Sequence, residues 1–382
     1  MTVTADVAVV GGGVIGTAIA WRAAAAGLDV VLVDPQRDDG ASLVAAGMLA
    51  PVSESIFGEE PLLRLNLLAV RRFPTFAADL EERTGQHIGL RQEGTLAVAY
   101  DPGDHAALLR LTEFRRSVGL DAAELDSRAI RKLEPFLTPD VRGGALFAGD
   151  WSVDNRRYLA ALRQAAQAAG VRTVPGLVSR ITSAGAELAG GGAISCGTVV
   201  VAAGWGSAGI AGLPGRLADV VRPVKGQLLR LRLPAAMPPV LSHTVRAVVR
   251  GTDVYLVPRA DGELVVGATQ EERGPDRTVT AGAVHDLLRD ALSVLPVLSE
   301  LVLAETCAGL RPGTLDNGPL AGPAGAGLLL ATGHYRNGIL LSAVTADAAV
   351  AWLTGQPPAA EWAPFTPDRF PAPVRHDEPR PA

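Results

Sequence analysis

The chain has 382 residues, of which 48% are apolar and 20% are charged. This composition is typical of a globular protein of two or three domains, and it excludes a disordered, collagen-like or disulfide-stapled chain. The formal net charge of −5 argues against a nucleic-acid or anionic-membrane partner, because either would favour a basic surface. Cys196 and Cys307 are the two cysteines, so we expect no disulfide framework, no metal site and a reducing, cytoplasmic location.

The N-terminal segment is predicted to form a strand, a helix and a second strand. Residues 6–10 and 29–33 are apolar runs, and residues 17–26 are small and apolar, as in a helix packed tightly on a sheet. A unit of this kind implies parallel strands. Since no basic region precedes the first run, we expect neither a signal peptide nor a transit peptide.

Helices and strands are also predicted along the rest of the chain. The periodicity predicts helices over residues 60–85, with an interruption at Pro74, and over 105–119, 126–133, 155–169, 281–294 and 342–353. Strands are predicted over 90–100 (a pair around Gly94), 171–181, 198–203, 221–233, 254–258 and 263–268. The proline-rich residues 356–382 are expected to be extended, with the last dozen disordered.

The strongest motif is Gly11-Gly12-Gly13-Val14-Ile15-Gly16, between the first strand and the first helix. Gly11 permits the tight turn, Gly13 lets the backbone approach a pyrophosphate, and Gly16 lets helix and strand pack closely. The helix N-terminus offers free N–H groups to the phosphates. Asp34 ends the next strand, where its carboxylate can accept hydrogen bonds from a ribose diol. The motif predicts a dinucleotide site but does not separate NAD from FAD.

Three further segments favour a flavin. Residues 42–49 form a loop of small residues, residues 198–205 form a strand that ends in glycine, and residues 333–339 form a loop bracketed by glycines. Small residues near the ends of several strands suit a large planar ring that lies against backbone. A nicotinamide-dependent dehydrogenase, which would be colourless when purified, is the alternative that the glycine motif alone leaves open.

With these segments, the chain resembles the D-amino acid oxidase and glycine oxidase group of FAD-dependent amine oxidases. Within that group it is most similar to the glycine oxidases of the thiazole branch of thiamine synthesis. The matching segments follow the family's order along nearly the whole chain: residues 11–34, 45–49, 201–204, 223–227, 255–259, 266–269, 309–314 and 333–341.

The resemblance implies an α/β fold of two parts. An FAD-binding Rossmann-like domain would be discontinuous, over residues 1–85, 141–221 and 305–370. A substrate-binding domain with a mainly antiparallel sheet and helices would take residues 86–140 and 222–304, and residues 371–382 would be a disordered tail. The resemblance also implies a homo-oligomer.

Residues that hold FAD carry over from the family one by one. They are Gly11, Gly13, Val14, Ile15, Gly16, Asp34, Pro35, Ser42, Gly47, Met48, Leu49, Val178, Ala203, Gly204, Gly333, His334, Tyr335, Arg336, Asn337, Gly338, Ile339 and Leu340. Binding is expected to be non-covalent. The alternative is a covalent bond at Cys307, since related sarcosine oxidases carry a flavin-linked cysteine in this region, although the local sequence differs from theirs.

Four residues carry over as the substrate site. Arg311, Tyr255 and Arg336 match the groups around the substrate carboxylate, which a planar guanidinium can hold with two parallel hydrogen bonds. Gln270 stands where these glycine oxidases often carry methionine, so it is the residue that puts the substrate preference in question. The chain has only two lysines, so arginine stands in most basic positions and a single arginine is weak evidence of function.

Two other basic residues are expected to be structural. His334 is expected to be a loop histidine bonded to backbone rather than a catalyst. Lys225 is expected to be exposed at a strand end, with a place near the flavin as the alternative.

The resemblance implies oxidation of glycine to glyoxylate and ammonia through the imine, with reduction of O2 to H2O2, and a role in supplying thiazole synthesis. An oxidase or dehydrogenase for sarcosine, proline or small D-amino acids is the near alternative. A non-catalytic flavin-binding partner protein is the alternative from another class. A small amino acid and O2 are thus the expected partners, with no nucleic acid and no membrane.

Overall fold

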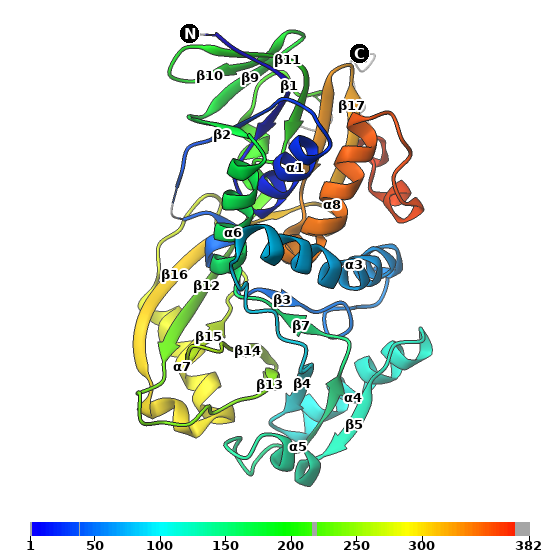
Figure 1. Ribbon diagram of the computed structural model, residues 1–382. Coiled ribbons are helices and arrows are strands. Elements are labelled where there is room, and N and C mark those ends of the chain that lie inside the picture. The colour runs from blue at the N-terminus through cyan, green and yellow to red at the C-terminus, as the bar shows by residue number, and fades with distance from the viewer. Residues whose placement is uncertain (1, 38, 216–219, 371–382) are drawn as a thin grey trace, which may run out of the picture.

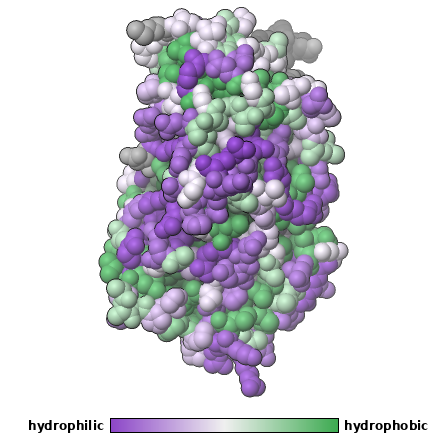
Figure 2. All heavy atoms as spheres, in the orientation of Figure 1, coloured by the Kyte–Doolittle hydropathy of each residue, from purple (hydrophilic) through white to green (hydrophobic). Residues whose placement is uncertain are grey.

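A computed structural model describes residues 2–37, 39–215 and 220–370 of the chain. The fold contains two large sheets that lie one above the other in Figure 1. Helices cross the middle of the molecule between the sheets. Figure 2 shows hydrophilic side chains across this middle part of the surface in the same orientation.

The first sheet has eight strands and is mainly parallel along its central path. The path runs β17 (Leu320–Gly325), β18 (Leu328–Thr332), β11 (Ala193–Val201), β1 (Thr2–Val10), β2 (Val30–Asp34) and β8 (Arg172–Pro175), and β10 (Gly185–Leu188) and β9 (Val178–Thr182) extend it from β11. The predicted parallel strand–helix–strand unit is confirmed, since β1 and β2 pair in parallel across α1 (Val14–Ala25).

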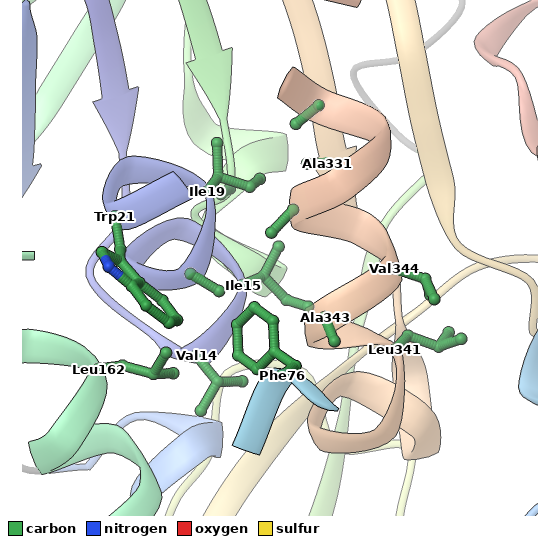
Figure 3. Packing of buried hydrophobic residues seen from close by; sticks show 14 of the residues in the cluster. Val14, Ile15, Ile19, Trp21, Phe76, Leu162, Ala331, Leu341, Ala343 and Val344 are labelled. Carbon is green, nitrogen blue, oxygen red and sulfur yellow. The ribbon is translucent and has the colours of Figure 1, made fainter. Parts of the chain in front are cut away.

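Two helices, α1 and α8 (Gly338–Leu353), pack on one face of this sheet (Figure 1). Helix α6 (Asn155–Ala168) packs against α1, and α3 (Glu60–Thr84) packs against α8 and α6. Small side chains let α1 and α8 pack closely, and the rings of Trp21 and Phe76 meet edge to face at 5.1 Å. Each large apolar side chain buried in this way contributes roughly 1.5–3 kcal/mol. Figure 3 shows this packing around Val14, Ile15, Ile19, Trp21, Phe76, Leu162, Ala331, Leu341, Ala343 and Val344.

The second sheet also has eight strands and is antiparallel except where β13 meets β4. Its order is β16 (Val302–Gly313), β12 (Arg222–Arg232), β15 (Glu263–Gly267), β14 (Thr252–Pro258), β13 (Thr244–Val249), β4 (Thr95–Ala99), β6 (Gly143–Phe147) and β5 (Ala123–Asp126). Its helices are α7 (Ala281–Val294), α4 (Pro102–Ser117) and α5 (Ser127–Leu133).

Short elements complete the chain. They are α2 (Ala41–Val44), the pair β3 (Met48–Leu49) and β7 (Trp151–Ser152), and the 3-10 turns η1 (Gly204–Gly209), η2 (Pro296–Glu300), η3 (Tyr335–Asn337), η4 (Ala360–Phe365) and η5 (Pro367–Arg369). Among the described residues, no helix combines the length and apolar character that a membrane span needs. The division into two discontinuous domains stays a prediction. It places β6 wholly and β16 mostly in the FAD-binding part, yet both strands pair within the second sheet.

Three expectations about local structure were wrong. Helix α3 continues through Pro74, because its long buried face offsets the roughly 3 kcal/mol that an interior proline costs. The strand pair around Gly94 is reduced to β4 and an isolated bridge at Arg91. The described part of the tail forms η4 and η5 rather than extended chain, because Trp362 packs against Trp352, with ring centroids 6.1 Å apart. Residues 371–382, predicted to be disordered, lie outside the described residues.

Candidate active site

A cavity of about 570 Å³ lies between the two sheets. One end is lined by residues 10–15, where β1 passes into α1. The other end is lined by side chains of the second sheet, including Tyr255 and Arg311. The predicted cofactor motif and the predicted substrate residues therefore share one continuous space.

The first end is shaped by glycines. Gly11 has a positive φ of 108°, and a Cβ there would lie 2.5 Å from the Ala202 carbonyl oxygen. A Cβ at Gly13, the N-cap residue of α1, would lie 2.9 Å from the hydroxyl oxygen of Ser42. The same hydroxyl accepts the Val14 N–H at 3.0 Å. The open N-terminus of α1 therefore faces the cavity with its positive dipole end, as a phosphate group requires.

Asp34, at the end of β2, accepts hydrogen bonds from the backbone in addition to its predicted role toward a ribose diol. One of its carboxylate oxygens accepts the Gly12 N–H at 2.6 Å, and the other accepts the Gln36 N–H at 2.7 Å. A carboxylate has about four lone-pair sites, so both oxygens keep acceptor capacity toward the cavity that Asp34 lines.

Residues 42–47 pass along the cavity wall and are held from behind by buried polar side chains. The Asn155 amide donates to the carbonyl oxygens of Ser42 at 2.8 Å and Leu43 at 3.0 Å. The Arg259 guanidinium donates to the carbonyl oxygen of Ala46 at 2.6 Å. Burial lowers the pKa of Arg259 to about 10, so it stays a cation at neutral pH. The sequence assigned neither residue a role, because arginines are too common in this chain for Arg259 to stand out and Asn155 lies outside the matching segments.

At the second end of the cavity, two of the predicted substrate residues lie directly over glycines. Arg311, on β16, lies over Gly226 of the neighbouring strand β12, and a Cβ at Gly226 would collide with its guanidinium. Tyr255, on β14, lies over Gly267 of β15 in the same way. The Arg311 guanidinium donates to the Thr269 carbonyl oxygen at 3.2 Å. Any larger residue at either glycine would displace the side chain above it.

Tyr255 keeps its proton at neutral pH. Burial raises the pKa of its hydroxyl, against the opposite influence of the Arg311 cation. The pair therefore presents a guanidinium and a phenol O–H to the cavity, which are donors suited to a carboxylate.

Arg336 and Gln270 are also among the residues that line the cavity. Gln270 is exposed, and it lies at the cavity's open side rather than in its buried floor. The Arg336 guanidinium lies 5.1 Å from the centre of the Tyr335 ring and 4.0 Å from the Glu59 carboxylate. Its Nε atom is buried and has no hydrogen-bond partner among the described residues.

Most of the predicted cofactor residues line the cavity, and five do not. Those five are buried, and they are Gly16, Leu49, Gly333, Asn337 and Leu340. His334 lines the cavity, but its ring nitrogen Nε2 bonds to the Thr345 hydroxyl at 3.0 Å and not to backbone, so that expectation was wrong. Burial lowers the pKa of His334 to about 3, which leaves the ring neutral.

Lys225 is buried, which contradicts the expected exposed position. It lies on β12, next to the edge strand β16, and Glu271 forms a bridge to it on the other side. Its ammonium group bonds to Asp276 at 2.5 Å, with Glu271 at 4.0 Å.

Cys307 belongs to a small apolar cluster and does not line the cavity. Burial raises the pKa of its thiol to about 11, so the thiol is protonated. A half-buried, protonated thiol outside the cavity is poorly placed for the covalent alternative.

The residues at the first end fit FAD. Glycines stand where a Cβ would meet backbone or a neighbouring side chain, an open helix N-terminus faces the cavity, and an acid ends the second strand. Among the described residues, no group of three or more His, Cys, Asp or Glu side chains is arranged to hold a metal ion.

Comparison with known proteins agrees with this fit. The family model described as FAD dependent oxidoreductase (DAO) matches residues 6–352. The chain is 35% identical to the glycine oxidase of Geobacillus kaustophilus, over 96% of this chain and 97% of that protein. It is also 35% identical to the bifunctional protein ThiO/ThiG of Synechocystis, over 97% of this chain but 55% of that protein. The chain thus spans about half the length of this relative.

Solved structures give the same result. The crystal structure of the Geobacillus kaustophilus glycine oxidase superimposes with a TM-score of 0.87, at 34% identity, and covers 95% of this chain and 98% of that one. The iminodiacetate oxidase of Chelativorans gives a TM-score of 0.84 at 25% identity, with 94% and 98% covered. The chain therefore belongs to the family of FAD-dependent oxidoreductases, and FAD is its cofactor.

Proposed function

We propose that this member of the family oxidises glycine to glyoxylate and ammonia and reduces O2 to H2O2. The observation that carries the proposal is the Arg311–Tyr255 pair, which lies over two glycines at the end of the cavity that begins at the nucleotide-binding loop. The names of the relatives that match most of their own length support glycine as the substrate.

The substrate carboxylate would bind the Arg311 guanidinium and the Tyr255 hydroxyl, with Arg336 as a further donor. This grip would fix the α-carbon, and orientation of this kind can supply a large part of an enzyme's rate. Glycine loses two electrons and two protons to give its imine, and water then hydrolyses the imine to glyoxylate and ammonia. The two electrons and two protons convert O2 to H2O2, so the reaction balances.

The predicted cofactor residues that line the cavity would hold FAD. They run from Gly11, at the start of the nucleotide loop, to Ile339, at the start of α8. When bound, it supplies the two-electron redox chemistry that these side chains lack. We further propose that the reaction supplies thiazole synthesis in thiamine biosynthesis, as the name of the bifunctional relative suggests, in a cytoplasmic homo-oligomer.

Sarcosine, proline or a small D-amino acid is the second candidate substrate. It is favoured by Gln270, a polar residue on the cavity wall. An amide there replaces the apolar methionine that similar glycine oxidases often carry, and so changes the surface that a substituent absent from glycine would contact.

Product measurement tests the proposal. The holoenzyme with glycine in air should form glyoxylate, ammonia and H2O2 in equal amounts. Arg311→Met should lower kcat/KM for glycine by about 100-fold or more, since a charged hydrogen-bonded pair is lost. The matched control is Arg131→Met, at a surface helix. A holoenzyme that forms H2O2 with sarcosine, proline or a D-amino acid but not with glycine would replace glycine with the second candidate, and one that oxidises no amine would contradict the proposal.

A further inference from the structure

The cavity also contains three charged side chains beside Tyr255 that the proposed reaction does not use. They are Glu54, Arg246 and Asp253. We infer that these three residues form a specificity subsite, which accepts a cationic substituent on the amino acid substrate and rejects an anionic one. The inference rests on the proposed function, because it takes the substrate carboxylate to lie at Arg311 and Tyr255.

The sheet brings two of the three residues next to Tyr255. Arg246 on β13 pairs directly with Tyr255 on β14. Asp253 precedes Tyr255 by two positions on β14, so both side chains point to the same face of the sheet. A substrate held at Tyr255 that extends away from Arg311 therefore reaches Arg246 and Asp253.

Glu54 enters from the other side of the cavity. Its carboxylate accepts a hydrogen bond from the Arg246 guanidinium at 2.7 Å. The Glu54 side chain is only 10% exposed, while that of Arg246 is 24% exposed. The guanidinium is thus partnered, and its charge is offset by Glu54.

Residues 52–55, which carry Glu54, are anchored by two buried charged groups. Asp150 accepts the Val52 N–H at 2.8 Å and the Ser53 N–H at 3.0 Å. Arg115 donates to the carbonyl oxygens of Ser53 at 2.5 Å and Ser55 at 3.2 Å. Glu54 is therefore held in place before a substrate arrives, which lowers the entropic cost of binding.

The charges of the subsite favour a cationic substituent over an anionic one. Two carboxylates face one guanidinium, and the anchoring groups behind them, Asp150 and Arg115, carry opposite charges. The subsite is left with an excess of one negative charge, at Asp253, which is exposed at the cavity. A cationic substituent would be attracted to it and an anionic one repelled, and specificity is the difference between those two free energies.

The test compares substituted glycines of opposite charge on the holoenzyme. N-(2-aminoethyl)glycine places the cation on nitrogen, and D-2,3-diaminopropanoate places it on the α-carbon. Iminodiacetate is the anionic counterpart of the first. Two ethers, (2-aminoethoxy)acetate and oxydiacetate, replace the reacting nitrogen by oxygen, so their Kd values from the flavin absorption spectrum report binding without amine oxidation.

We expect the cationic ether to bind at least about tenfold more tightly than the anionic one, and the two corresponding amines to show the same order in kcat/KM. D-2,3-diaminopropanoate shows whether the α-side-chain direction shares this preference. Asp253→Lys should reduce the ratio of the anionic ether's Kd to the cationic ether's Kd by about tenfold or more, and Glu54→Gln should also reduce this ratio. Asp121→Lys, at an exposed position outside the cavity, is the matched control.

Equal Kd values for the two ethers in the wild-type protein would overturn the inference. So would an Asp253→Lys ratio within twofold of that of Asp121→Lys. If no amine is oxidised while the ethers keep their tenfold ratio and Asp253→Lys reduces it, the proposed oxidase function fails and the subsite stands.

Discussion

At the scale of single residues, two glycines decide where the proposed substrate-binding side chains can lie. Gly226 and Gly267 have no side chains, so Arg311 and Tyr255 can lie flat across neighbouring strands of the second sheet. The same strands would pack equally well with alanine as far as backbone pairing is concerned. The glycines therefore belong to the site as much as the charged residues do.

Gly226→Ala tests this role. The new Cβ would collide with the Arg311 guanidinium and displace it, whereas the strand would still form. We expect kcat/KM for glycine to fall by about 100-fold, which is a typical cost of a displacement near 1 Å in an active site. The measurement is steady-state kinetics together with the unfolding midpoint in urea.

Gly190→Ala is the matched control, because a Cβ at Gly190 would meet nothing within 4 Å. A Gly226→Ala enzyme with the wild-type kcat/KM would show that Arg311 does not act from this position.

At the scale of elements, residues 52–55 show how a loop with no regular structure is fixed. A fully buried carboxylate, Asp150, accepts two of its backbone N–H groups. Burial raises the pKa of Asp150 from 3.8 to about 6, since desolvation outweighs these hydrogen bonds. The loop is therefore held at a cost in stability that depends on pH.

The sign of that dependence follows from proton binding. Between pH about 4 and 6 the folded protein keeps a proton on Asp150 that the unfolded chain has released, so the free energy of unfolding falls as the pH rises. Urea unfolding of the wild type and Asp150→Asn at pH 4.5 and 7 should show the wild type losing stability relative to the variant. A difference that stays constant, or that moves in favour of the wild type at pH 7, would contradict the assignment.

In the described part of the tail, residues 356–370, packing depends mainly on one side chain. Trp362 is 1% exposed and contacts both Trp352 and Phe365. Trp362→Ala should lower the free energy of unfolding by about 3–5 kcal/mol. Leu315→Ala, at a side chain 74% exposed, is the control and should change it by less than about 0.5 kcal/mol. Equal losses in the two variants would show that the tail does not pack as described.

Sequence patterns predict the elements whose formation depends on residues close to one another in the chain. The unit of β1, α1 and β2 follows from apolar runs and the glycines between them, and the structure confirms it. Pro74 inside α3, the buried Lys225 and the folded tail could not be predicted, because each depends on a partner distant in sequence. Lys225 is buried only because Asp276 supplies a carboxylate 51 positions later.

At the scale of the whole molecule, the cavity joins two sheets whose strands come from alternating parts of the chain. The glycine loop of residues 11–16, the strand β14 and the strand β16 meet there although they lie far apart in sequence. The resemblance predicted most of the wall, since the family's motifs lie at these places. It missed Glu54, Arg246 and Asp253, which stand outside the motifs and gave no local signal.

We propose that this cavity holds FAD and glycine in reacting positions. The test mixes the purified holoenzyme with glycine in the absence of oxygen and follows the flavin absorption band. We expect the band to bleach and air to restore it. A band that stays unchanged with saturating glycine, while dithionite bleaches it, would show that glycine does not react in this cavity.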